Sequence, residues 1–433
     1  MTQRYDTYKD SGVQWLGEIP GHWGCVRLKN VCTGFSNGTT ADQVDFLDGT
    51  VSVTRIETIS KGIINYEKVG HVQYSNNLLN YRLQVGDILF SHINSYERVG
   101  NCALYEGEHP LYHGMNLMRI TPISKFAHYK FIHYYLISPL FLKQVQLKCK
   151  PAINQVSIPG KYVKDLRLTL PPLSEQRSIV SFLDSKCGKI DEWVTKKQKE
   201  VEHLQELKQR VIADAVTRGL NPHVKMKATN IPWLKEIPEH WEALRAKHMF
   251  NKEQRPVEEG DEIVTCFRDG EVTLRKNRRT TGFTEATDYS HYQHICKGDL
   301  VIHQMDAFAG SAGVSDSDGM GTPVLSVCTP KSNNILNEYY AHIVRLMGKN
   351  GFIVSLYRGI RERSSDFRFD TFANLWLPVP TIEEQKQIVA HITDKTSKID
   401  KLITNITKEI ERIKEYKQRL ISDVVTGQIK VNQ

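Results

Sequence analysis

The sequence predicts an α+β fold with an internal pseudo-two-fold repeat, in which two mixed α/β domains are separated by two long helices that pair antiparallel as a coiled coil. Three observations predict this fold. Two motifs recur at fixed offsets along the 433 residues. Each repeat contains a long segment with a seven-residue apolar period, and the segments between the motifs hold short apolar runs typical of strands. At roughly 100–200 residues per domain, the length allows two to four units.

The repeat consists of similar ends and different middles. Residues 15–23 (WLGEIPGHW) and 233–241 (WLKEIPEHW) share seven of nine positions, and residues 171–220 recur at 380–429. A weaker echo pairs Gly86-Asp87 with Gly298-Asp299. Drift after a plain duplication would blur the ends as much as the middles. The pattern therefore favours two recognition surfaces with different targets on one frame.

The segments at 171–220 and 380–429 are predicted to be long helices. Residues 174–217 contain no proline and a single glycine, and residues 383–426 contain neither. Thr381 and Glu384 form a capping box at the second start, and Ser174 is a possible cap at the first. The apolar period of seven begins at Val180 and Val389 and persists for five heptads, which indicates a coiled coil. About 44 residues span ~66 Å, and helices of equal length with matching seams are expected to pair antiparallel, with the globular domains at opposite ends.

The helices carry more apolar surface than a two-helix seam needs. Lys208 and Lys417 interrupt the seam at the same heptad position, where polar groups fix register at a cost in stability. Beside the seam, the flanking positions hold further apolar residues in both repeats. We expect them to dock two copies of one partner, one per repeat: Ile179, Trp193, Leu207, Ile388, Leu402 and Tyr416.

The predicted organisation has four segments. They are a first variable domain at 1–172, a first long helix at 173–218, a second variable domain at 219–380 and a second long helix at 381–433. Both variable domains are predicted to run from strands through a helix to a final strand. The expected elements are strands at 51–56, 88–93, 117–121 and 165–170 with a helix at 125–148, then strands at 263–267, 300–303, 324–329 and 375–379 with a helix at 336–347.

Polar and basic residues gather in the predicted loops of both variable domains. Arg, Asn and Gln offer hydrogen bonds to base edges, and clustered Lys and Arg contact phosphates. The formal net charge of +8 permits such a partner. The candidate DNA-binding residues are Arg55, His92, Asn94, Tyr96, Arg98, His113, Asn116, Lys150, Asn154, Gln155, Arg275, Lys276, Arg278, Arg279, His303, Gln304, Arg358, Arg361, Arg363 and Arg368.

Catalytic and cofactor motifs are missing from the sequence. It has no phosphate-binding loop and no aminomethyltransferase motif, so we expect no enzyme activity and no bound cofactor. His291 and His294 have metal-ligand spacing but no nearby companions in sequence, so no metal site is predicted.

The eight cysteines form no Cys-x-x-Cys pair, and the polar start has no signal core. The scattered cysteines indicate reduced thiols and a cytoplasmic protein, and the absence of an apolar run of membrane length argues against a membrane span.

The repeated elements at 15–23, 171–176, 233–241 and 380–385 resemble those of type I restriction–modification specificity subunits. The resemblance covers nearly the whole chain and implies that each variable domain is a target recognition domain for one half of a split double-stranded DNA sequence. It also implies that the helices set the gap and dock two modification subunits, which bind S-adenosylmethionine and methylate adenine. Restriction subunits would join the full complex. The second copy departs from the pattern where Thr381 replaces a second proline.

Two other classes of protein remain open. A free-standing DNA enzyme is disfavoured by the missing cofactor and nuclease motifs. A duplicated coiled-coil scaffold that binds no nucleic acid would show the same repeat and heptads, and it stays as the alternative.

Overall fold

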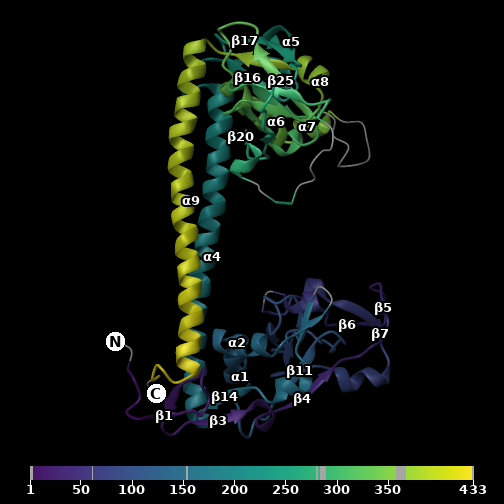
Figure 1. The fold of residues 1–433 in the computed structure, drawn as a ribbon, viewed down its shortest axis with the longest axis vertical. Helices are drawn as coiled ribbons and strands as arrows, with labels where there is room; N and C mark the ends of the chain where they lie inside the picture. The colour runs from purple at the N-terminus through teal and green to yellow at the C-terminus, as the bar shows by residue number, and fades with distance from the viewer. Residues whose placement is uncertain are drawn as a thin grey trace. The chain divides into compact units, whose positions relative to one another are not determined.

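The computed structural model describes residues 3–60, 62–152, 155–278, 281–282, 289–356 and 367–431. The chain forms two compact units, residues 1–198 with 407–433, and residues 199–406. The two long helices, α4 (Leu173–Arg218) and α9 (Ile382–Val425), each contribute one segment to each unit. Figure 1 shows the antiparallel course of α4 and α9 within each unit. Among the residues described, no helix is both long and apolar enough to cross a membrane.

The first unit is built on an antiparallel four-stranded sheet of order β10-β8-β11-β4. Helix α1 packs on strands β10 and β11, and its aromatic residues fill a core that also contains the first turns of α4 and the last turns of α9. The strands are β1 (Tyr8–Asp10), β2 (Glu18–Pro20), β3 (Gly24–Arg27), β4 (Cys32–Asn37), β5 (Gln43–Val44), β6 (Thr50–Val53), β7 (Gly70–Gln73), β8 (Ile88–Phe90), β9 (Ile93–Asn94), β10 (Cys102–Leu104), β11 (Met118–Pro122), β12 (Lys150–Ala152), β13 (Gln155–Ser157) and β14 (Arg167–Leu170).

The helix predicted at 125–148 is two helices, α1 (Tyr129–Leu136) and α2 (Pro139–Lys148). The prediction of one helix was wrong because Ser138 caps α2, its hydroxyl accepting a hydrogen bond from the Phe141 amide at 3.4 Å. Pro139 then takes the first helical position, where its missing N–H costs nothing. A short third helix, α3 (Gly160–Lys164), packs on β4.

The second unit repeats this plan with different side chains. Its four-stranded sheet has the order β18-β25-β22-β23, and α6 (Asn337–Lys349) packs on β22 and β23. The strands are β15 (Met226–Ile231), β16 (Leu234–Pro238), β17 (Glu242–Arg245), β18 (Phe250–Glu253), β19 (Val264–Cys266), β20 (Val272–Leu274), β21 (Gln293–Ile295), β22 (Leu300–His303), β23 (Ala312–Val314), β24 (Gly319–Gly321), β25 (Leu325–Pro330) and β26 (Trp376–Val379). The remaining helices are α5 (Ala246–Met249), α7 (Phe352–Ser355) and α8 (Phe369–Ala373).

The weak sequence match between the variable segments, Gly86-Asp87 with Gly298-Asp299, corresponds to a turn that both units share. Gly86 and Gly298 both have positive φ, at 97° and 94°. Each following aspartate accepts a hydrogen bond from the amide three residues earlier, Asp87 from Gln84 and Asp299 from Cys296, both at 2.8 Å. The turn leads into the central strands β8 and β22, so the echo marks the same place in both sheets.

The motif at 15–23 meets the start of α4. The indole of Trp23 is fully buried, and its Nε1 donates to Glu175 Oε2 at 3.1 Å. His22 Nε2 lies 2.8 Å from the same oxygen. The carboxylate also sits in the first turn of the helix, where the helix dipole favours negative charge.

The motif at 233–241 repeats this contact at the start of α9. Trp241 Nε1 donates to Glu384 Oε1 at 3.3 Å, and His240 Nε2 lies 2.8 Å from that oxygen. Glu384 Oε2 accepts from the amide of Thr381, which completes the predicted capping box. At α4 the helix begins at Leu173, before Ser174, so Ser174 is not its cap.

The glutamine after each of these glutamates is completely buried. The side-chain amides of Gln176 and Gln385 each make three hydrogen bonds, all to main-chain groups, at 2.8–3.1 Å. Their partners are the amide of His128 and the carbonyls of Phe126 and Pro171 in the first unit, and the amide of Leu336 and the carbonyls of Asn334 and Pro380 in the second. The two motifs therefore join each variable domain to a long helix.

We expect Glu384→Gln to destabilise the second unit by about 1–3 kcal/mol at neutral pH, the range for losing hydrogen bonds to a charged group. Burial alone would raise the pKa of Glu384, but hydrogen bonds from His240, Trp241 and the Thr381 amide hold it below its ordinary value of 4.5. A lowered folded-state pKa gives stability that is present above pH 4.5 and is lost as the pH falls through the folded pKa. Thermal unfolding at pH 7 and at lower pH measures the difference between variant and wild type.

The matched control is Glu383→Gln, because Glu383 is the exposed neighbour in the same helical turn. Equal unfolding midpoints for the two variants at pH 7 would contradict the role of Glu384, as would a deficit that does not shrink in acid.

Candidate nucleic-acid interface and helix seam

The seam predicted from the heptads is buried in both units. In the first unit it joins one segment of each helix, and its buried members are Val180, Leu183, Cys187 and Val194 on α4 with Ile410, Leu420 and Val424 on α9. In the second unit the buried members are Ala215 on α4 with Ile392, Ile399 and Ile406 on α9. The coiled-coil prediction is confirmed within each unit.

The two lysines in the seam make reciprocal ion pairs. In the first unit, Lys417 Nζ lies 2.7 Å from both carboxylate oxygens of Asp191. In the second unit, Lys208 Nζ lies 2.6 and 2.7 Å from those of Asp400. In the 209-residue repeat, Lys208 matches Lys417 and Asp191 matches Asp400. A lysine in the seam thus finds its carboxylate on the other helix, which fixes the helix register.

Four of the six predicted docking residues stay accessible. Leu207, Leu402 and Tyr416 are 47%, 51% and 53% exposed, and Trp193 is half-buried. In the first unit, Trp193 and Tyr416 line a shallow groove of about 220 Å³ together with Lys186, Lys189, Ile190, Ile413 and Leu420. In the 209-residue repeat, Leu402 matches Trp193 and Leu207 matches Tyr416.

Ile179 and Ile388 are corrections to the predicted docking set. Both side chains are buried, at 0% and 1% exposure, in the cores of their own units. They lie near the helix starts, where the variable domains already cover the flanking position. Helix periodicity alone cannot distinguish an apolar residue that faces a partner from one that faces its own domain.

Three candidate DNA-binding segments of the first unit meet in one small sheet of order β12-β13-β9. In its register, Asn94 pairs with Val156, and Lys150 pairs with Ser157. Lys150 and Gln155 are exposed, whereas Asn94 is half-buried and is held by Ser91 Oγ and the Ser95 amide. Arg55, Tyr96, Arg98 and Asn116 are exposed in other loops of the same unit.

His92 and His113 are corrections to the DNA-binding set, because both side chains are buried at 7% and 0% exposure. His113 Nε2 donates to the Leu117 carbonyl at 3.0 Å, and burial lowers the pKa of His113 to about 4. Burial also lowers the pKa of His92. The two neutral imidazole rings pack inside the loops that hold the neighbouring candidate residues. In this conformation they cannot reach a base edge.

A basic patch in the first unit extends the set. Lys150 Nζ and Lys161 Nζ lie 5.8 and 5.2 Å from the ring centroid of Tyr162, and Lys164 Nζ lies 5.9 Å from that of Phe35. The exposed basic members of the patch are Arg27, Lys29, Lys148, Lys150, Lys161 and Lys164, and Arg27 and Lys29 pair with the carboxylate of Asp165. A hydrogen bond from Lys29, followed by the charges of Lys29, Arg27 and Lys148, lowers the pKa of Asp165.

Sequence reasoning missed Lys161 and Lys164, which belong to this patch. Their signal was the pattern of two lysines and a tyrosine in 161–164, just before the predicted strand at 165–170. The five-residue helix α3 is too short to give a periodicity that could be detected.

Among the described candidates of the second unit, Lys276 and Arg278 are paired with acids. Lys276 contacts Glu262, and Arg278 Nη1 lies 2.8 Å from carboxylate oxygens of both Asp269 and Glu271. The Arg278 guanidinium also stacks 4.2 Å from the Phe267 ring centroid. Arg275 is half-buried, and Arg368 is exposed.

His303 and Gln304 lie directly at the end of β22, and both are half-buried. Gln304 Nε2 donates to the Pro323 carbonyl and to Ser326 Oγ, and His303 Nδ1 accepts from the Asp306 amide at 3.1 Å. Five further candidates lie outside the described residues: Asn154, Arg279, Arg358, Arg361 and Arg363.

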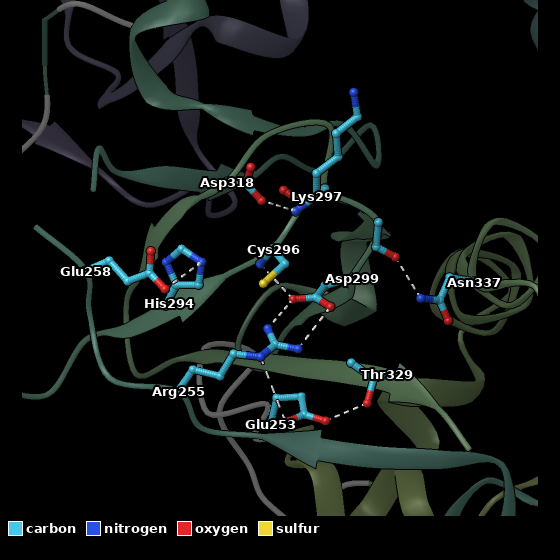
Figure 2. Close-up of polar contacts among 12 residues, drawn as sticks. Glu253, Arg255, Glu258, His294, Cys296, Lys297, Asp299, Asp318, Thr329 and Asn337 are labelled. Atoms are coloured by element: carbon cyan, nitrogen blue, oxygen red, sulfur yellow. Dashed lines mark hydrogen bonds and ion pairs between the residues drawn. The ribbon is translucent and has the colours of Figure 1, made fainter. Parts of the chain in front are cut away.

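A potential metal cluster appears where the sequence predicted none. His294, Cys296 and Asp318 in the second unit offer ligand atoms that all lie within 4.8 Å of one another. Figure 2 shows these side chains beside the ion pair of Arg255 and Asp299. His291, which has metal-ligand spacing to His294 in the sequence, is exposed and is not a member.

The chain contains the same α+β fold twice, each copy with a two-helix seam, and the loops of the two copies differ. This arrangement is typical of a class of protein that presents two recognition surfaces. The family described as "Type I restriction modification DNA specificity domain" matches residues 20–203 and 240–412. The chain therefore belongs to this family and contains two copies of the domain. The assignment to type I restriction–modification specificity subunits, made from the repeated motifs, is confirmed.

Related proteins agree with this assignment over most of the chain. The putative type I restriction enzyme MjaX specificity subunit of Methanocaldococcus jannaschii is 29% identical, covering 96% of each chain. The EcoBI specificity subunit of Escherichia coli is 21% identical, covering 68% of this chain and 65% of its own. A chain in a solved structure on complex assembly of the type I R-M system has a TM-score of 0.68 at 16% identity, covering 95% of this chain and 99% of that one. That last similarity establishes the fold.

Proposed function

We propose that this chain provides sequence specificity to a type I restriction–modification complex, with each variable domain recognising one half of a bipartite double-stranded DNA target. The observation that carries the proposal is the double copy of one frame around two different loop surfaces. Identical frames place two domains equivalently, and different loops give them different targets. The proposed division assigns recognition to residues 1–172 and 219–380, and spacing to residues 173–218 and 381–433.

The proposed DNA-binding surface of the first domain is the basic patch around Tyr162 with the neighbouring β12-β13-β9 sheet. Exposed lysines supply phosphate contacts that orient the duplex, and Gln155 supplies an amide suited to a base edge. In the second domain, Arg278 and Lys276 would exchange their carboxylate partners for phosphates on binding. The alternative, a scaffold that binds no nucleic acid, leaves the basic patch without a role.

The proposed protein partners are two modification subunits, joined by restriction subunits in the full complex. Trp193 and Tyr416 form one docking face, and Leu402 with Leu207 forms the matching face in the second unit. S-adenosylmethionine would bind the modification subunits, and this chain would supply specificity without catalysis.

Replacing Lys161 and Lys164 together with alanine is expected to weaken DNA binding and to reduce its salt dependence. Each lost phosphate contact lowers the slope of log K against log salt by about 0.9, so the double variant should lose about 2. Fluorescence anisotropy on the assembled methyltransferase complex, at several salt concentrations, measures the slope. Lys196→Ala, which removes an exposed lysine from α4, is the control. An unchanged slope in the double variant would show that the patch does not contact phosphates.

Shortening both helices by one heptad is expected to shorten the unspecified gap in the DNA target. Deleting residues 195–201 and 404–410 keeps both Lys–Asp pairs and removes about 10.5 Å of helix, or about 3 base pairs at 3.4 Å each. Methylome sequencing of a host that carries the variant complex reads the gap directly. Exchanging the two seven-residue segments keeps the length and should leave the gap unchanged. A shortened protein that methylates the original motif would refute the role of the helices as spacers.

Removing one docking face is expected to halve the number of modification subunits. Trp193→Ala with Tyr416→Ala should leave one bound copy, and so should Leu402→Ala with Leu207→Ala, because each pair lies in a different unit. Native mass spectrometry of the purified complexes counts the copies. A wild-type complex with a single copy would overturn the two-face proposal.

A further inference from the structure

The cluster of His294, Cys296 and Asp318 is built by two strands of the second unit. Strand β21 pairs antiparallel with β24, with His294 opposite Met320 and Ile295 opposite Gly319. Continuing this register sets Cys296, the residue after β21, opposite Asp318, the residue before β24. The Lys297 amide donates to Asp318 Oδ1 at 2.7 Å and fixes the approach of the two chain segments.

The imidazole of His294 is oriented as in many metal-binding histidines. Its Nδ1 lies 2.8 and 3.1 Å from the two carboxylate oxygens of Asp261, and both side chains are only 8% exposed. A carboxylate at Nδ1 fixes the ring tautomer and leaves Nε2 with its lone pair for a metal. Nε2 lies 4.0 Å from Glu258 Oε1, beyond hydrogen-bond distance.

The charges around the cluster favour a cation. Glu258 and Asp261 contribute carboxylates from one loop, and Asp318 contributes a third from the turn before β24. The nearby guanidinium of Arg255 is already paired with Asp299, its Nη1 and Nη2 at 2.5 and 3.3 Å from the two oxygens. Figure 2 shows Glu258, His294, Cys296 and Asp318 on the same side of this pair.

We propose that His294 Nε2, Cys296 Sγ and a carboxylate oxygen of Asp318 bind a zinc ion, with Glu258 as the fourth ligand and Asp261 as the support of the histidine. A mixed set of one nitrogen, one sulfur and two oxygens suits Zn²⁺ and disfavours Mg²⁺ and Ca²⁺, which take oxygen ligands. Ligand atoms in such a site lie about 3.3–3.8 Å apart, so the three must close by about 1 Å. Asp318 is exposed and Cys296 half-buried, which leaves their side chains room to move. Binding forms the Zn–S bond as the thiol releases its proton to water.

The role of this zinc site is structural. It ties the loop at 258–261 to β21 and to the turn before β24, next to the small core of Val264, Cys266, Val272, Ile295, Val301, Leu325 and Val327. All four proposed ligands come from the protein, so no position is open for catalysis. The inference does not depend on the proposed function, because it concerns only the second unit's own packing.

Zinc and cobalt titrations of the tag-free, full-length chain test the proposal. A single zinc equivalent is expected, and Co²⁺ in its place should give tetrahedral d–d bands and a thiolate charge-transfer band. Cys296→Ser should abolish the charge-transfer band, and Asp261→Asn should weaken binding 10–100-fold, as loss of a histidine-orienting carboxylate does. His291→Asn, Asp316→Asn and Cys149→Ser are matched controls that should bind as the wild type does.

A second measurement needs no variant and so is independent of folding defects. Zinc should protect Cys296 from alkylation in the wild-type chain, and mass spectrometry of the modified peptides locates the label. Equal alkylation of Cys296 with and without zinc would overturn the proposal, as would full zinc binding by a folded Cys296→Ser protein.

Discussion

The buried glutamine at the start of each long helix is the contact on which the architecture depends. An amide taken out of water costs free energy unless each polar atom finds a partner, and Gln176 and Gln385 each find three. All of those partners are main-chain groups. Every residue offers a main-chain carbonyl, and every residue except proline offers a main-chain N–H, so the variable domain can change most of its side chains without losing its attachment. This explains how two domains with different surfaces use one frame.

The seam adds a second constraint that acts along the helices. Apolar heptads alone permit a slip of one helix on the other by seven residues, because each position would again meet an apolar neighbour. Lys208 and Lys417 remove that freedom, since only one register brings each lysine to the aspartate on the opposite helix. The pairs are partly exposed and contribute little to stability. Their effect is on specificity of pairing, which a spacer between two recognition domains requires.

The frame could be predicted from the sequence because its signals are periodic or repeated. The heptads located α4 and α9, and the paired motifs located the junctions, although nothing in sequence showed that Trp23 would bind Glu175. The loop residues were harder. His92 and His113 lie in polar segments that are typical of a binding loop, but both are buried by strands that are distant in sequence. The burial of Ile179, at the edge of the seam, likewise depends on parts of the domain that are distant in sequence. Asp318 lies 22 residues from Cys296 in the chain, so only the pairing of β21 with β24 brings the proposed zinc ligands together.

Among the described residues, the lysines around Tyr162 and the guanidinium of Arg278 are held differently, and this difference has a physical consequence for recognition. Around Tyr162, Lys150 and Lys161 lie over the ring and are exposed, so their field reaches into solvent and can attract a polyanion. In the second unit, Arg278 is held by two carboxylates and by the ring of Phe267. When the Arg278 guanidinium moves to a DNA phosphate, it exchanges one ion pair for another. The net change in binding free energy is therefore small. Under the proposed function, the patch around Tyr162 therefore contributes more to affinity and to its salt dependence than Arg278 does. Arg278 is already held in one orientation in the second domain. It therefore contributes to the correct placement of the DNA more than to the strength of binding.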